Sequence, residues 1–221
     1  MTLDHFLAIV FIQTTLSAIV FLVCMYHYRK REKYIKLIGF IFLVGFLANV
    51  AAFIFRNVGL QKIINTPQTF YMITNITLVT IIYFKLFRRK PLDWLWIAVP
   101  FFLLAVANTA FIQKDKINTI TLVIQSFIIL IYTLVYFYRL MVELPAQHIH
   151  HVPMFWFNSA FLIFHAGTFF LFVFTDYIVH VMKNNMITYW SFHNALSIIE
   201  HSIVLVGLYY DFKSRDNMHV G

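Results

Sequence analysis

The stretch ITYWSFHNALSIIEHSIVLVGLYY, Ile187 to Tyr210, decides the fold class. It is longer than the about 20 mostly apolar residues that a helix needs to cross the hydrocarbon of a bilayer. Six more runs of this kind cover approximately residues 5–27, 36–55, 69–87, 92–112, 117–140 and 154–177. A membrane β-barrel would instead show runs of about ten alternating residues. The sequence therefore predicts an all-α integral membrane protein, a bundle of seven transmembrane helices.

The bulk composition agrees with this class. The chain has 221 residues, of which 61% are hydrophobic and 12% charged, whereas a soluble domain has about 25% charged residues. No polar stretch exceeds a short loop, so we expect one domain over residues 1–221 without a linker. The first run has no basic residue before it and exceeds a signal-peptide core in length, which predicts a retained helix. A single cysteine, Cys24, excludes an intrachain disulfide.

The basic residues predict the orientation. Lys and Arg concentrate in the loops after the first and third runs and in the C-terminal tail: Arg29, Lys30, Arg31, Lys33, Lys36, Lys85, Arg88, Arg89, Lys90, Lys213 and Arg215. The alternate loops hold fewer: Arg56, Lys62, Lys114, Lys116 and Lys183. Because basic residues favour the cytoplasmic side, we expect the N-terminus outside and the C-terminus in the cytoplasm. The same clustering explains the net charge of +8 without a nucleic-acid partner.

The last run carries a polar stripe. With 3.6 residues per turn, His193, Ser197 and Glu200 fall on one helix face, and His201 lies close to that face. A charged side chain in the middle of a membrane helix costs about 2.5 to 3.5 kcal/mol on insertion scales, so it normally faces the bundle interior. These four residues are therefore candidates for a ligand or proton site.

The preceding run adds a fifth candidate. His165 lies about 18 Å along its helix from Pro153, and Glu200 lies about 16 Å along the last helix from Tyr189. In a hydrocarbon core of about 30 Å, the two antiparallel helices bring these residues to within one turn in depth. We expect a polar pocket between the sixth and seventh helices.

Three interpretations of this pocket stay open. In the first, Glu200 is protonated, or is hydrogen-bonded to His165 or His193, and only fixes helix packing. In the second, the set responds to a proton or a small ligand. In the third, His165, His193, Glu200 and His201 hold a catalytic zinc ion with activated water. No catalytic residue can be assigned from the sequence.

Two seven-helix families can be compared at this point. Membrane hydrolases of the progestin-receptor and alkaline-ceramidase type use a His-x-x-x-His pair in the last helix, whereas His193 and His201 are eight positions apart and the second and third runs contain no histidine. A retinal protein needs a lysine in the middle of the last helix. The nearest lysine is Lys213, beyond the end of the run, so no retinal is expected.

Two segments carry a family resemblance: FWFNSAFLIFHAGTFFLF, Phe155 to Phe172, and WSFHNALSII, Trp190 to Ile199. The Phe-Trp opening, Gly167 and the Trp three residues before His193 resemble the last two helices of small bacterial seven-helix modules that act as, or beside, input regions of sensor histidine kinases. The resemblance implies a sensor in the bacterial cytoplasmic membrane. Only Phe212 to Gly221 follow the last run, so output would need a separate kinase, unless the chain is part of a longer protein.

Neutral polar residues also occur inside the runs. We interpret five amides as interhelical hydrogen-bonding groups, worth about 0.6 kcal/mol each: Asn49, Asn75, Asn108, Gln125 and Asn158. Together with Thr74, Thr77 and Thr80 they could line a central cavity.

We therefore expect a membrane receptor or sensor that signals through a separate partner, in preference to an enzyme. The alternatives are a metal-dependent intramembrane hydrolase acting on lipid-like substrates and a small transporter or proton channel. Membrane lipids are expected partners, zinc is the one cofactor with a conceivable ligand set, and a homo-oligomer stays open.

Overall fold

The computed structural model describes residues 3–59, 66–113, 118–143, 146–175, 177–178 and 186–219. Within them, seven helices are long and apolar enough to cross a membrane, which confirms the predicted all-α class and the number of long apolar helices. The long helices are α1 (Leu3–Met25), α2 (Lys33–Asn57), α3 (Thr66–Leu86), α4 (Leu95–Ala107) with its π-helical extension η3 (Asn108–Ile112), α5 (Thr119–Glu143), α6 (Pro153–Val173) and α8 (Met186–His219). Two short 3-10 segments, η1 (Tyr28–Lys30) and η4 (Ala146–His151), lie between them.

The structure differs from the sequence prediction most at two helix ends. Helix α6 ends at Val173, four residues before the expected end at residue 177. The last helix was expected to end near Tyr210, but α8 continues to His219. Apolar length alone marks only the part of a helix that can lie in hydrocarbon. The polar continuation after Tyr210 follows from helix cooperativity, because extending an existing helix adds one hydrogen bond for each residue fixed.

The chain forms two compact units. Unit 1 comprises Met1–Leu16 and Ser126–Gly221, and unit 2 comprises Ser17–Gln125. Helices α1 and α5 therefore contribute to both units. Each unit is described below by itself.

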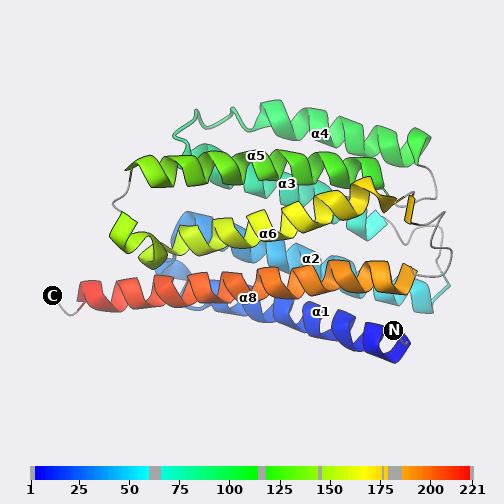
Figure 1. The fold of residues 1–221 in the computed structure, drawn as a ribbon, viewed down its shortest axis with the longest axis horizontal. Helices are drawn as coiled ribbons and strands as arrows, with labels where there is room; N and C mark the ends of the chain where they lie inside the picture. The colour runs from blue at the N-terminus through cyan, green and yellow to red at the C-terminus, as the bar shows by residue number, and fades with distance from the viewer. Residues whose placement is uncertain are drawn as a thin grey trace. The chain divides into compact units, whose positions relative to one another are not determined.

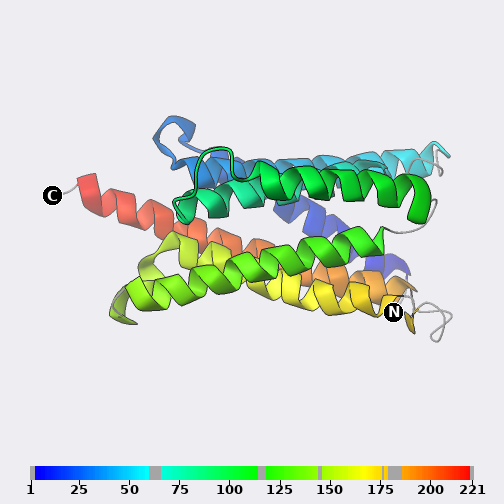
Figure 2. The ribbon, with the colours of Figure 1, turned by 90° about the horizontal axis from the view of Figure 1, so that it is seen from above.

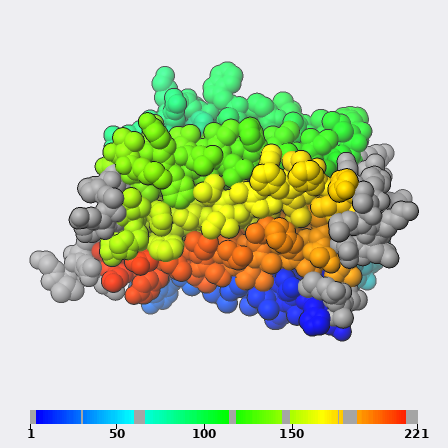
Figure 3. Space-filling model, viewed as in Figure 1, coloured from blue at the N-terminus to red at the C-terminus, as the bar shows by residue number. Residues whose placement is uncertain are grey.

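Unit 1 is built on the antiparallel pair α6 and α8, which pack extensively against each other. Figures 1 and 2 show the two helices side by side along their length, and in Figure 3 their side chains pack against each other in the yellow and orange-red regions. Most buried residues of α6 lie three or four positions apart, as one face of a helix requires: Met154, Phe157, Asn158, Ala160, Phe161, His165, Thr168 and Phe172. This spacing places His165 within the buried face.

Two glycines bring α6 and α8 close together. A Cβ atom on Gly167 would lie 2.6 Å from Cδ1 of Leu196, and a Cβ atom on Gly207 would lie 2.7 Å from Cε1 of Phe157. Both glycines therefore face the neighbouring helix at short range. These two contacts also define the register of the pair, because Gly167 lies opposite Leu196 and Gly207 lies opposite Phe157.

Unit 2 is built on α2, α3 and α4, of which α2 and α3 pack most extensively. Gly45 of α2 faces the ring of Tyr71 on α3, 3.2 Å from where its Cβ would be. Ser17, in the second half of α1, donates a hydrogen bond to the carbonyl oxygen of Phe42, at 2.9 Å. Arg31 is buried, and its guanidinium donates to the carbonyl oxygens of Tyr26 and Val23, both at 3.0 Å. It thereby caps the last carbonyls of α1.

Candidate functional site

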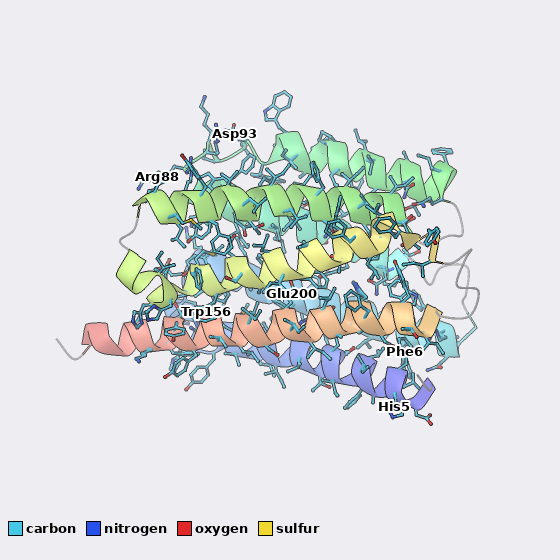
Figure 4. The ribbon with its side chains drawn as sticks, viewed as in Figure 1. His5, Phe6, Arg88, Asp93, Trp156 and Glu200 are labelled. Carbon is cyan, nitrogen blue, oxygen red and sulfur yellow. The ribbon has the colours of Figure 1, made fainter. Side chains whose placement is uncertain are left out.

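Glu200 lies midway along α8, as Figure 4 shows. Its side chain is 7% exposed. Within the described residues its carboxyl group makes no hydrogen bond or ion pair. A buried acid in a membrane helix normally has a partner, so this carboxyl group is exceptional and is the centre of the candidate site.

His165 lies at nearly the same level but does not bond to Glu200. From the Gly167–Leu196 contact, antiparallel counting places His165 opposite residue 198 of α8, about 3 Å along the axis from Glu200. The Nδ1 atom of His165 instead lies 3.4 Å from Oγ of Ser126 on α5. The register of the two helices therefore places His165 and Glu200 at nearly the same depth, as predicted. A direct bond between these two side chains is not found among the described residues.

His193 is the second polar group without a hydrogen-bond partner. The ring is half-buried, and its Nδ1 atom is buried and unpaired among the described residues. Aromatic rings surround it: the centroids of Phe164, Phe172 and Trp190 each lie 5.6 Å away. The ring of Phe164 also contacts the ring of His165, with the two centroids 5.1 Å apart. Two imidazoles thus lie in an aromatic environment between α6 and α8.

The remaining two candidates bond to their own helix. Oγ of Ser197 donates to the carbonyl oxygen of His193 at 3.1 Å. Nδ1 of His201 bonds to the carbonyl oxygen of Ser197, and a carbonyl can only accept, so this nitrogen carries the proton. Both residues are buried. The polar stripe expected on the last helix is therefore present. Its members differ in whether their polar atoms already make hydrogen bonds.

The metal interpretation gains no support from this geometry. Across residues 3–59, 66–113, 118–143, 146–175, 177–178 and 186–219, no three side chains of His, Cys, Asp or Glu come together in a way that could hold a metal ion. His165, His193, Glu200 and His201 do not form such a group. A zinc site needs three or four ligands at about 2 Å from one point.

The prediction that amide side chains bond between helices is partly confirmed by contacts within each unit. Asn158 donates to the carbonyl oxygen of Thr133 at 3.1 Å, and Nε2 of Gln68 donates to Oδ1 of Asn49 at 3.2 Å. Thr77 instead bonds to the carbonyl oxygen of Ile73 in its own helix. These bonds link α5 to α6 in unit 1 and α2 to α3 in unit 2.

The sequence interpretation missed two members of a polar cluster in unit 2, Gln113 and Asn118. Both take part in side-chain hydrogen bonds at the ends of η3 and α5. A signal was available: the dipeptide Asn-Thr occurs at 108–109 and again at 118–119, on either side of one short loop. Paired polar residues at two neighbouring helix ends favour contact between those ends.

Comparison with known proteins adds no family: no protein-family model, curated protein or solved structure matches this chain. The functional conclusion therefore depends on the residues themselves.

Proposed function

We propose that this protein is a membrane receptor or sensor whose responding groups are Glu200, His193 and His165. It lies in a bacterial cytoplasmic membrane with its N-terminus outside and its C-terminus in the cytoplasm, as the basic residues indicate. A proton or a small hydrogen-bonding ligand acts at these groups. The signal passes to a separate cytoplasmic or membrane partner such as a histidine kinase, in line with the sequence resemblance.

The unpaired carboxyl group of Glu200 carries this proposal. A structural role would require bonds between helices, and Glu200 makes none within the described residues. An ionisable residue at this depth costs about 2.5 to 3.5 kcal/mol on insertion scales. A group that is costly and holds nothing together is best explained by a role in binding or proton exchange.

The packing of α6 against α8 supports a mechanical output. The helices are in close contact at Gly167, within the site, and again at Gly207, seven residues beyond Glu200, where an added Cβ atom would meet the neighbouring helix. Because packed interfaces adopt discrete arrangements and do not deform continuously, a ligand or charge at Glu200 shifts one helix against the other. The pair of α6 and α8 thus has two arrangements, and protonation or ligand binding at Glu200 changes which arrangement is favoured.

Aromatic contacts then connect α8 to the loop before α6. The rings of Trp156 and Tyr210 stack at 5.6 Å with an angle of 5° between them, and Trp156 is labelled in Figure 4. Nε1 of Trp156 donates to the carbonyl oxygen of His150 at 2.8 Å, and the ring of His151 contacts Tyr210. A movement of α8 therefore reaches η4, which by the proposed orientation faces the cytoplasm, where a partner can bind.

Distance measurements between α6 and α8 test this function. Spin labels at Ile163→Cys, 42% exposed on α6, and Ser202→Cys, exposed on α8, report the helix pair in a Cys24→Ala background. We expect the distance distribution of the labelled protein in lipid nanodiscs to change between acidic and neutral pH. Glu200→Gln should remove that change, while Glu143→Gln, the same substitution at an exposed acid ending α5, should keep it.

An unchanged pH response in Glu200→Gln would overturn the proposal. A protein that retains one zinc ion through purification and cleaves lipid would instead support the hydrolase alternative. Uptake of protons or solutes into proteoliposomes would support the transporter.

A further inference from the structure

Side-chain amides and hydroxyls of unit 2 form a cluster where α4 ends and α5 begins. The segment η3 is π-helical: the amide nitrogen of Gln113 donates to the carbonyl oxygen of Asn108, five residues back, at 2.7 Å. Single π turns are frequent at functional sites. This turn brings the side chains of Asn108 and Gln113 within 2.9 Å of each other. We call Asn108, Gln113 and Asn118, with the hydroxyls that they contact, the amide cluster.

The orientation of the Asn108 amide is fixed by its neighbours. The side-chain oxygen of Gln113 accepts the backbone N–H of Ile120 at 3.1 Å, so it is an acceptor. The Asn108 atom beside it must therefore be the nitrogen, which donates to it at 2.9 Å and to Oγ1 of Thr121 at 3.0 Å. Both hydrogens of the Asn108 amide are used. Its Oδ1 has no partner among the described residues, although the side chain is 0% exposed.

The Asn118 amide is fixed by a similar argument. Thr109 donates its only hydroxyl hydrogen to the carbonyl oxygen of Ala105 at 2.8 Å, so its oxygen can only accept from Asn118. The Asn118 nitrogen therefore donates to Thr109 at 3.0 Å and to Oγ1 of Thr69 at 2.8 Å. Its Oδ1 is also buried without a partner in the described part of the chain. Both unpaired atoms are carbonyl oxygens, not nitrogens.

The unpaired oxygens belong to one region of unit 2. Asn118 immediately precedes α5, and Thr121, which accepts from the Asn108 amide, lies three residues later in the first turn of α5. Both amides are therefore held at the same end of α5. Oxygens of Gln125 and Asn75 are likewise buried and unpaired. Counted from the Asn118–Thr69 bond, Gln125 is about 10 Å along α5 and Asn75 about 9 Å along α3. The four unpaired oxygens therefore lie at two depths along the helices, those of Asn108 and Asn118 at one depth and those of Gln125 and Asn75 at the next.

We propose that the amide cluster binds a small monovalent cation, Na⁺ or K⁺, through the side-chain oxygens of Asn108 and Asn118. Carbonyl oxygens are hard ligands that replace the water shell of such ions. The helices α3 and α4, the segment η3 and residues 118–125 contain no Asp or Glu. A neutral set of oxygens suits one positive charge, since two would need carboxylates in a buried site. The oxygens of Gln125 and Asn75 form a second level along the same helices.

Thermal unfolding of the full chain in detergent tests the cation site. A ligand that binds only the folded state raises Tm in a saturable manner. We expect Tm to be higher in NaCl or KCl than in choline chloride at equal ionic strength. Asn108→Leu should remove this increment. Asn158→Leu, which alters another fully buried amide but in unit 1, should retain it, and so should Glu200→Gln.

Three results would overturn the inference. The first is an equal Tm for the unaltered protein in all three salts. The second is a full increment in both Asn108→Leu and Asn118→Leu. The third is an increment lost in Glu200→Gln but kept in Asn108→Leu, which would place the cation at the carboxylate.

Equilibrium dialysis covers the case in which the variants do not fold. The unaltered protein, dialysed against radioactive Na⁺ and, separately, Rb⁺ as a substitute for K⁺, should bind about one ion per chain, displaced by the unlabelled salt and not by choline. Absence of such binding for both ions would also refute the site. Since the amide cluster shares no residue with the Glu200 site, either proposal can fail without the other.

Discussion

The amide cluster of unit 2 and helix α8 of unit 1 use their buried polar groups in opposite ways. In the amide cluster, side chains bond from one segment to another, as Asn118 does to Thr69 at 2.8 Å. In unit 1, polar side chains of α8 bond mainly to their own backbone, as Ser191 does to the carbonyl oxygen of Ile187 at 2.6 Å. Bonds between helices fix packing, whereas bonds within a helix leave it free to shift. The comparison explains why the proposed moving element lies in unit 1.

The difference also separates two kinds of unpaired group. Glu200 is an ionisable group without any bond among the described residues. Asn108 and Asn118 have used every donor and keep only acceptor oxygens. The former suits exchange of a proton or ligand, and the latter suits retention of an ion. Substitutions in both units test how the helices are held together, from the largest expected effect to the smallest.

The largest effect is expected at the close contact of α8 with α6. A side chain at Gly207 would meet the ring of Phe157, which is fully buried. We expect Gly207→Val to lower the free energy of unfolding by about 3 kcal/mol, the upper range for overpacking. At Gly167 the obstacle is the flexible end of Leu196, so Gly167→Ala should lower it by less than about 1 kcal/mol. Reversible unfolding in mixed micelles measures both, and equal losses would contradict the rigid contact.

Removing the carboxyl group at Glu200 should stabilise unit 1. If Glu200 holds nothing together, Glu200→Leu removes a costly buried group, and we expect the free energy of unfolding to rise by about 2 kcal/mol. The matched substitution Glu143→Leu affects an exposed acid and should change the value by less than about 0.5 kcal/mol. A loss of stability in Glu200→Leu would show that the carboxyl group has a structural partner.

The fold was largely predictable because crossing a bilayer requires a long apolar run, which is visible without tertiary information. Helix ends were less so: α8 continues to His219 through a polar segment that hydropathy does not mark. The π-helical segment η3 was also missed, since one extra residue in a turn leaves the apolar content of its run unchanged.

The candidate sites differ in the same way. Glu200 stood out in the sequence because a single acid in an apolar run is unusual on its own. Asn118 did not, because its importance arises only when Thr109 and Thr69 receive its two hydrogens and leave its oxygen unpaired. The unpaired oxygen of Asn118 thus depends on contacts with two other segments of the chain, and no short stretch of sequence indicates it.

Substitution of Asn108 in unit 2 should lower the free energy of unfolding, whereas Glu200→Leu in unit 1 should raise it. Asn108→Leu removes two donated bonds at about 0.6 kcal/mol each, so we expect the free energy of unfolding to fall by about 1 kcal/mol in choline chloride. The absence of Na⁺ and K⁺ separates this loss from any effect of a bound ion. A gain in stability, as expected for Glu200→Leu, would show that the bonds of Asn108 to Gln113 and Thr121 do not hold the segments together.

The smallest effect is expected at Ser197. Its hydroxyl bonds to the carbonyl oxygen of His193 in the same helix, at 3.1 Å, and replacing it leaves the helix bonds intact. Ser197→Ala should therefore change the free energy of unfolding by less than about 0.5 kcal/mol and leave the pH-dependent distance between α6 and α8 unaltered.

The matched substitution is Ser126→Ala, since Ser126 is also buried but contacts His165 of another helix. It should lower the free energy by about 0.6 kcal/mol and alter the pH response. If Ser197→Ala had the larger effect on either quantity, the distinction between bonds within and between helices would not account for the behaviour of unit 1, and Ser197 would belong to the responding groups.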